Sequence, residues 1–179
     1  VQHGMSPIFG GGAPATSLFC QVYEALDPGC CILAVDEETS RIMASCFYHP
    51  RETHVSLGIM NVHPNYFGRR LAGQLLQFII NFADERSLPV RLVSSALNLD
   101  SFSLYTRSGF VPHFAYQDVM FSVPESGVDF AGDEKDAVRP ARLEDVAAMV
   151  ALEDELSGVQ REKDFRYFIE NELGVWHVS

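Results

Sequence analysis

The most regular pattern of apolar and polar residues lies between Arg69 and Arg86. Apolar side chains recur there every three or four positions, and polar side chains fill the stripe between them. This spacing predicts a long amphipathic helix that buries one face against a core. The predicted buried face consists of Leu71, Leu75, Leu76, Ile79, Phe82 and Ala83.

Shorter apolar segments on both sides of this helix have the composition of strands. A polar turn over residues 36–40 separates two of them, so these two are expected to form a hairpin. The predicted strands are Cys31–Val35, Ile42–Tyr48, Thr53–Val62, Val90–Ser95 and Tyr116–Val123. Two short helices are also predicted, Phe19–Leu26 before a Pro-Gly break and Ser101–Arg107 before Gly109.

The pattern changes after residue 123. Pro, Gly and acidic residues are frequent over 124–134, which is typical of a linker. A strand at Ala137–Ala141, a helix at Asp145–Leu156, a helix around Phe165–Leu173 and a strand at Val175–Val178 are then predicted. We therefore divide the chain into an N-terminal loop and short helix (1–30), a core (31–123), a linker (124–136) and a C-terminal strand–helix–helix segment (137–179).

Composition argues against several classes of function. The 179 residues carry a net charge of −11, which disfavours binding to nucleic acid because phosphates require Lys and Arg. No apolar run reaches the ~18 residues of a membrane span, and the N-terminus lacks the pattern of a signal peptide. The four cysteines have no zinc-ligand spacing with histidines. We therefore expect a cytoplasmic protein with free thiols, no metal site and no membrane or nucleic-acid partner.

The segment from Val62 to Leu76 carries the clearest candidate site. A strand enters a tight turn, and the turn opens the long helix, whose first N–H groups have no acceptor within the helix and carry partial positive charge. Small residues let a ligand approach the backbone, and two arginines add positive charge at the same end. These features predict a site for a diphosphate. The residues alone are equally consistent with an ordinary strand–helix connection.

This segment resembles the acetyl-CoA-binding motif of the GNAT superfamily of N-acetyltransferases. The motif is Arg/Gln-x-x-Gly-x-Gly/Ala after a strand that ends in Val-x-Pro and a Tyr, and Leu-Leu follows it. Phe67 and Arg70 depart from it, at the places where Arg or Gln and the first Gly are usual. The matching residues are Val62, Pro64, Tyr66, Gly68, Ala72, Leu75 and Leu76.

A second segment, Asn98 to Phe110, resembles another motif of the same superfamily, Asn-x-x-Ala-x-x-Leu-Tyr-x-Lys-x-Gly-Phe. Ser101 replaces its Ala and Arg107 replaces its Lys. In the superfamily this helix lies beside the pantetheine arm of the cofactor, and its Tyr, here Tyr105, often protonates the departing thiolate.

The resemblance implies an α/β fold with a mixed, mostly antiparallel sheet flanked by helices, and acetyl-CoA as co-substrate. It implies that backbone N–H groups on the strand ending at Val62 stabilise the oxyanion. As catalytic residues we predict Tyr105 and a base, for which His54 ranks before His49, His63 and Asp100. The predicted cofactor-binding residues are Asn61, Val62, Phe67, Gly68, Arg69, Arg70, Leu71, Ala72, Gly73, Asn98, Ser101 and Tyr105.

The expected activity is transfer of an acetyl group from acetyl-CoA to a primary amine, on a small molecule or a peptide, by direct attack in a ternary complex. The alternative is a catalytically silent module that binds acyl-CoA or another protein. Residues 137–179 resemble the opening of a GNAT domain, so they either begin a second, truncated domain or complete the first in a permuted arrangement. A core sheet without its first strand would expose an edge, so a homodimer is also among the expectations.

Overall fold

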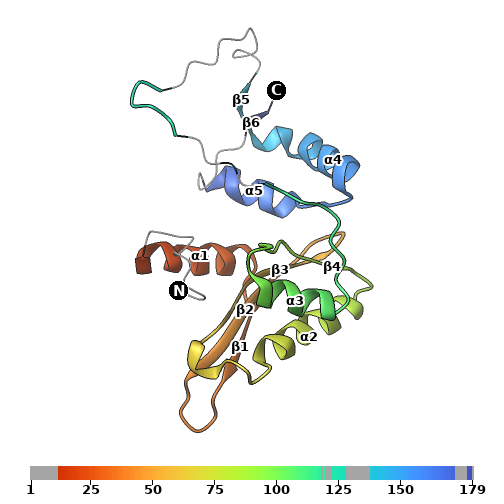
Figure 1. Ribbon diagram of the computed structural model, residues 1–179. Coiled ribbons are helices and arrows are strands. Elements are labelled where there is room, and N and C mark those ends of the chain that lie inside the picture. Colours follow the sequence, from red (N-terminus) through yellow and green to blue (C-terminus); the bar gives the residue numbers. More distant parts are fainter. Residues whose placement is uncertain (1–11, 118, 120–121, 128–137, 172–176, 179) are drawn as a thin grey trace.

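The computed structural model describes residues 12–117, 119, 122–127, 138–171 and 177–178. Its centre is a four-stranded sheet in the order β1-β2-β3-β4, in which β4 alone runs parallel to its neighbour, and β5-β6 form a separate sheet (Figure 1). The expected α/β fold, with a mixed and mostly antiparallel sheet flanked by helices, is confirmed. The elements are α1 (Gly12–Leu26), β1 (Cys31–Val35), β2 (Ile42–Pro50), β3 (Val55–Val62), the 3-10 turn η1 (Pro64–Tyr66), α2 (Leu71–Asp84), β4 (Val90–Arg91), α3 (Leu99–Arg107), β5 (Arg139–Pro140), the 3-10 turn η2 (Leu143–Asp145), α4 (Val146–Ser157), α5 (Glu162–Glu170) and β6 (His177–Val178).

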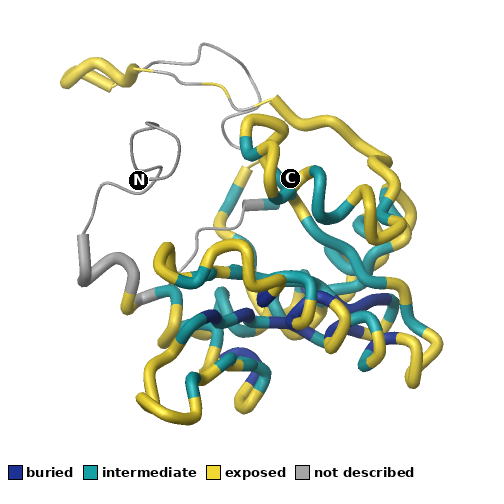
Figure 2. The backbone as a smooth tube through the Cα atoms, turned by 60° about the horizontal axis from the view of Figure 1, so that its bottom comes forward, coloured by how far each residue is buried: buried dark blue, intermediate teal, exposed yellow. Residues whose placement is uncertain are grey.

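One face of β2 builds the core with α2. Successive side chains of a strand point to opposite faces of the sheet, and every second residue of β2 is buried from Ala44 to Tyr48. The buried layer appears in dark blue in Figure 2. The predicted amphipathic helix is confirmed, with bounds at Leu71 and Asp84. The core cluster consists of Ala44, Cys46, Tyr48, Val55, Leu71, Leu75, Ile79 and Ala83.

The other face of β2 is covered by α1. Tyr23 of α1 packs edge-on against Phe47 and His49, with ring centroids 5.3 and 4.6 Å apart. The helix begins earlier than the predicted Phe19–Leu26. The sheet therefore separates α2 from α1, and each face of β2 packs against a different helix.

A bulge interrupts the pairing of β3 with β2. Gly58 and Ile59 together lie opposite Phe47, so the register shifts by one residue. A Cβ atom on Gly58 would lie 3.0 Å from the Phe47 carbonyl oxygen, which is tighter than ordinary contact. Glycine is therefore required where the two backbones come together.

The outer edge of β3 loses its partner strand after Ser56, just before the bulge. β4 pairs with β3 only at Val90 and Arg91. In the described part of the chain, no strand pairs with the edge Leu57–Val62. The predicted strand Val90–Ser95 is thus shorter than expected because the chain leaves the sheet, and Val93 is 87% exposed. An unpaired backbone edge therefore leads from the bulge towards the start of α2.

The predicted strand Tyr116–Val123 is not formed by those of its residues that the structure describes, 116, 117, 119, 122 and 123. A strand needs a neighbouring edge to bond with, and no described strand pairs with these residues. Tyr116 and Val119 are accordingly 77% and 78% exposed. Residues 128–136 of the predicted linker lie outside the described residues.

The C-terminal segment forms a small unit in which β5 pairs antiparallel with β6, and α4 packs against α5. Its predicted strand at Ala137–Ala141 is reduced to Arg139–Pro140, and both of its predicted helices are present. Figure 1 shows α5, in blue, beside the red α1 of the core, and the two helices are in contact. Among the described helices, none combines the length and apolar character that crossing a bilayer requires.

Candidate active site

The chain between β3 and α2 is held by local contacts. η1 begins with a proline, and His63 caps it because its ring nitrogen Nδ1 accepts a hydrogen bond from the backbone N–H of Asn65 at 3.2 Å. The guanidinium of Arg69 lies 5.1 Å from the centre of the Tyr66 ring, a cation–π contact. The turn thus has a defined shape before the helix begins.

Two residues of this turn have left-handed backbone. Gly68 has φ +79°, which glycine adopts without strain, and Arg70 has φ +60° at the N-cap of α2. A side chain at such an angle costs about 1–3 kcal/mol. The backbone at Arg70 therefore has the form that a glycine prefers, although the residue is arginine.

The start of α2 is open. Helix geometry leaves the N–H groups of its first turn, Leu71–Gly73, without acceptors in the helix, and no side chain among the described residues caps them. A Cβ atom added to Gly68 or Gly73 would meet no described atom within 4 Å. The side chain of Arg70 is exposed and has no hydrogen bond or ion pair with the described residues. The corner therefore presents free N–H groups, helix-dipole charge and arginines to an anion.

An unpaired strand edge that leads from a bulge to an open helix start fits an extended ligand with a diphosphate at one end. The family model of the GNAT acetyltransferases matches residues 6–110. The chain belongs to the GNAT family of acetyltransferases. This confirms the family expected from the two motifs, and the family uses acetyl-CoA as donor and amines as acceptors. No curated protein sequence matches the chain.

Solved structures similar to this GNAT domain are distant in sequence. An integron cassette protein from V. cholerae has 14% identity and a TM-score of 0.43, with 51% of this chain covered. The match spans 60% of the length of that protein. An acetyltransferase of Trypanosoma brucei has 18% identity and a TM-score of 0.46, with 65% of this chain and 82% of that one covered. A predicted acetyltransferase with acetyl-CoA from Clostridium acetobutylicum has 19% identity and a TM-score of 0.45, with 65% and 79% covered.

The second motif forms the helix α3. Asn98 is its N-cap, and the side-chain oxygen Oδ1 accepts a hydrogen bond from the backbone N–H of Ser101 at 3.2 Å. Tyr105 is half-buried and close to Cys46, which sits in β2 next to the bulge. Burial, and to a smaller extent that thiol, raises the pKa of Tyr105 above its ordinary value of 10.0. The phenol therefore keeps its proton at neutral pH, as an acid for a leaving thiolate must.

His54, the first-ranked base, lies just before β3 and is 2% exposed. Its two ring nitrogens lie 3.1 Å from the Thr53 hydroxyl and 3.0 Å from the Ser56 hydroxyl. Burial, followed by the charges of Arg91 and other nearby arginines, lowers the pKa of His54 to about 4. This imidazole is neutral at physiological pH, but both nitrogens are engaged and it is a weak base.

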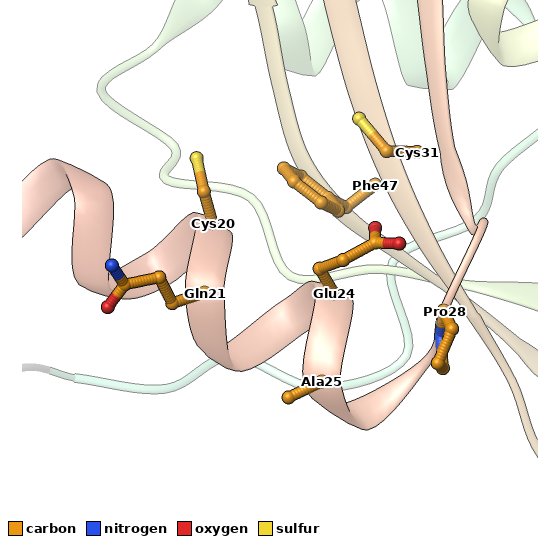
Figure 3. A pocket seen from close by; sticks show the side chains of 7 residues that line it. All are labelled: Cys20, Gln21, Glu24, Ala25, Pro28, Cys31 and Phe47. Carbon is orange, nitrogen blue, oxygen red and sulfur yellow. The ribbon is translucent and has the colours of Figure 1, made fainter.

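A groove of about 670 Å³ opens between α1 and the sheet, on the face opposite α2 (Figure 3). Its walls come from one side of α1 and from β1 and β2. Glu24 is the one charged side chain among the described residues that line it, so the groove is unsuited to a diphosphate. The lining consists of Cys20, Gln21, Glu24, Ala25, Pro28, Cys31 and Phe47.

A buried cluster of charges occupies the end of the sheet where β2 turns into β3. Asp27, 4% exposed, accepts hydrogen bonds from Arg51, from Lys163 at 2.7 Å and from the His49 ring at 2.7 Å. Arg51 also donates from Nε to Asp164 of α5 at 2.8 Å. Sequence reasoning missed Asp27 and Arg51, because nothing local marks residues whose partners lie more than 100 positions away.

The structure places nine of the twelve predicted cofactor residues along the path from β3 to α2. Asn61 and Val62 end β3, Phe67–Arg70 form the turn, and Leu71–Gly73 open α2. Leu71 is a core residue, so it can offer a ligand only its backbone. Ser101 and Tyr105 lie on α3, and Asn98 is its N-cap. Gly58 was not predicted, although a lone glycine inside an apolar strand is the usual sign of a bulge.

Proposed function

We propose that this GNAT domain transfers an acetyl group from acetyl-CoA to a primary amine by direct attack in a ternary complex. The diphosphate of the cofactor lies against the N–H groups of Leu71–Gly73, with Arg69 and Arg70 beside it. The pantetheine arm follows the unpaired edge of β3, and the thioester reaches the bulge at Gly58. The observation that carries this proposal is the continuity of that edge with an uncapped, unobstructed helix start.

The chemistry follows from this placement. The neutral amine nitrogen forms a bond to the thioester carbon, and backbone N–H groups freed by the bulge stabilise the oxyanion. Collapse of the intermediate breaks the carbon–sulfur bond, and the sulfur takes a proton from the Tyr105 hydroxyl. The raised pKa of this phenol supports the assignment, because the group carries its proton when the thiolate forms.

Isothermal titration with acetyl-CoA, followed by thiol release with a panel of small-molecule and peptide amines, tests the proposal. We expect binding, turnover with at least one amine, and a loss of turnover of about 10²-fold or more in Tyr105→Phe with cofactor affinity retained. Tyr116→Phe, an exposed tyrosine, is the matched control. Binding without turnover of any amine would instead support the silent acyl-CoA-binding module, and no binding at millimolar cofactor would contradict both.

We further propose that residues 137–179 begin a second GNAT-like unit docked on the first. In support, β5 and β6 pair with each other and not with the main sheet, and α4 and α5 lie between them in the chain. Removal of residues 137–179 should lower stability, because Asp27 and Arg51 lose Lys163 and Asp164, but should leave cooperative unfolding and acetyl-CoA binding in place if this is right. If the segment instead completes the first domain, the shortened chain should lose its cooperative unfolding transition.

Three points remain predictions: that the acceptor is a small-molecule or peptide amine, that the protein is cytoplasmic, and that it forms a homodimer. The edge position of β1 in the sheet supports a dimer, because an uncovered edge can pair with a second copy. Sedimentation at micromolar concentration tests it, and a monomer mass would contradict it.

A further inference from the structure

His49 is a buried histidine with a described hydrogen-bond partner for only one of its two ring nitrogens. It lies on β2, is 7% exposed, and faces α1 on the side of the sheet opposite the core helix α2. Its Nδ1 is 2.7 Å from a carboxylate oxygen of Asp27. Its other nitrogen, Nε2, is buried and has no hydrogen-bond partner among the residues that the structure describes. Buried polar atoms are rarely left without a partner.

The unpartnered nitrogen is directed at the bulge. A Cβ atom placed on Gly58 would lie 2.9 Å from Nε2, so the nitrogen occupies the space that a side chain at this position would fill. Gly58 is also the residue where β3 is interrupted opposite Phe47. The bulge, the glycine and the imidazole nitrogen therefore meet at one place.

The ionised carboxylate of Asp27 favours the tautomer of His49 that carries its proton on Nδ1. Burial by itself raises the pKa of Asp27, but hydrogen bonds from His49, Arg51 and Lys163 outweigh it and hold this pKa well below its usual range. An ionised Asp27 then takes the Nδ1 proton in a hydrogen bond, and Nε2 keeps its lone pair. The charged or titratable groups that face or adjoin His49 are Asp27 and Tyr23 from the α1 side, Arg51 from β2, and Lys163 and Asp164 from α5.

From this geometry we infer that His49 is the base that accepts the proton of the acceptor amine, and that Asp27 positions it. The inference rests on the proposed function, which puts the thioester at the bulge. The amine nitrogen forms its bond to the acetyl carbon and passes its proton to Nε2, directly or through one water. The C–S bond breaks, and the sulfur takes a proton from Tyr105. Both side chains then return to their starting states by proton exchange with solvent.

This assignment differs from the first-ranked base, His54. The hydroxyls of Thr53 and Ser56 engage both nitrogens of His54. His49 has a carboxylate on one nitrogen and a free lone pair on the other, which is the arrangement of an oriented general base.

The test compares His49→Asn with wild type, and His113→Asn serves as the control because His113 is an exposed histidine. Asparagine can still donate a hydrogen bond to Asp27 but cannot accept a proton. We expect kcat/KM for the amine to fall about 100-fold and the Kd for acetyl-CoA to change less than threefold. His49→Gln should behave alike and provides a second variant if the first does not fold.

A series of acceptor amines of decreasing pKa separates catalysis from structure. An amine that is already neutral at the assay pH needs less help from a base, so the loss in His49→Asn should shrink as the amine pKa falls. An equal loss for every amine would overturn the inference and leave the proposed function standing. If wild type transfers acetyl to no amine while binding acetyl-CoA, the proposed function fails, and the inference fails with it.

Discussion

The two ends of β3 are built in opposite ways. At its C-terminal end, the turn and the first turn of α2 are exposed, and the candidate cofactor site consists mainly of backbone N–H groups. At its N-terminal end, Asp27, Arg51 and His54 are at least 94% buried, and the hydrogen bonds of Asp27 and Arg51 join the ends of α1 and β2 to α5. The first end keeps space for a ligand, and the second end holds separate segments together.

This difference decides what each end tolerates. A backbone site depends on conformation and on small residues, so substitutions there should alter ligand binding more than stability. A buried charge cluster depends on complete pairing, because a charge left without its partner is costly. Four predictions test this contrast.

The largest effect is expected for Arg51→Met. Arg51 pairs with the buried carboxylate of Asp27 and the partly buried carboxylate of Asp164, and both would lose this partner. We expect the free energy of unfolding to fall by about 3–5 kcal/mol, measured by urea denaturation. Arg166→Met, which breaks an exposed i,i+4 pair with Glu162, should cost less than about 0.5 kcal/mol. Equal losses of unfolding free energy in the two variants would mean that the buried cluster stabilises the fold no more than an exposed ion pair does.

His54 should make stability depend on mildly acidic pH. Its folded pKa of about 4 lies below the ordinary value of 6.5, so below pH 6.5 the unfolded chain binds a proton that the folded chain does not. Stability is therefore complete above pH 6.5 and falls as the pH drops towards 4, by about 3 kcal/mol in all. His54→Gln should flatten this decline in denaturation curves recorded between pH 7 and 4. An unchanged slope in the variant would contradict the assigned pKa.

Gly58→Ala and Gly73→Ala should have opposite effects on stability. Alanine at 58 would crowd His49 and Phe47 and should cost about 1–3 kcal/mol. Alanine at 73 meets nothing within 4 Å of the described chain and should stabilise α2 by up to about 1 kcal/mol. The same methyl group faces the proposed diphosphate, so acetyl-CoA binding should weaken roughly tenfold, about 1.4 kcal/mol, by titration calorimetry. Stronger binding in Gly73→Ala would argue against a ligand at this corner.

The smallest effect is expected for Arg70→Gly. Glycine relieves the left-handed strain but adds freedom to the unfolded chain, so the net gain should be about 1 kcal/mol or less. Ser40→Gly, at a comparable φ of +55° in the β1–β2 turn, is the control. Both should raise the melting temperature slightly, whereas Arg70→Gly alone should change acetyl-CoA affinity. A change of affinity in Ser40→Gly would show that the effect is not specific to the corner.

The same contrast explains what could be predicted from the sequence. The α2 corner was predictable because its features are consecutive, from Val62 to Gly73. The amphipathic helix was predictable because its pattern has a period. The charge cluster was not, because Arg51 and Asp164 meet only after folding, 113 positions apart. The strand at Val90–Ser95 was overestimated because its apolar composition fits a strand, while the point at which β4 leaves β3 depends on tertiary structure.

The base illustrates the same limit. His54 was ranked first from its position near the start of a strand, which gives no indication of its burial or of its neighbours. His49 is a candidate base because Asp27, 22 positions away, holds one ring nitrogen and Gly58 on the adjacent strand leaves space beside the other. Such arrangements depend on strand register, which the sequence pattern alone does not specify.

The central claim is that acetyl-CoA binds along the unpaired edge of β3 and at the start of α2. The most direct measurement is a titration of acetyl-CoA followed through assigned backbone amide shifts. We predict the largest changes at Leu71–Gly73 and at Gly58–Val62, with small changes around the groove at Cys20 and Glu24. Changes confined to that groove, or no change at the α2 corner at saturating cofactor, would contradict the account.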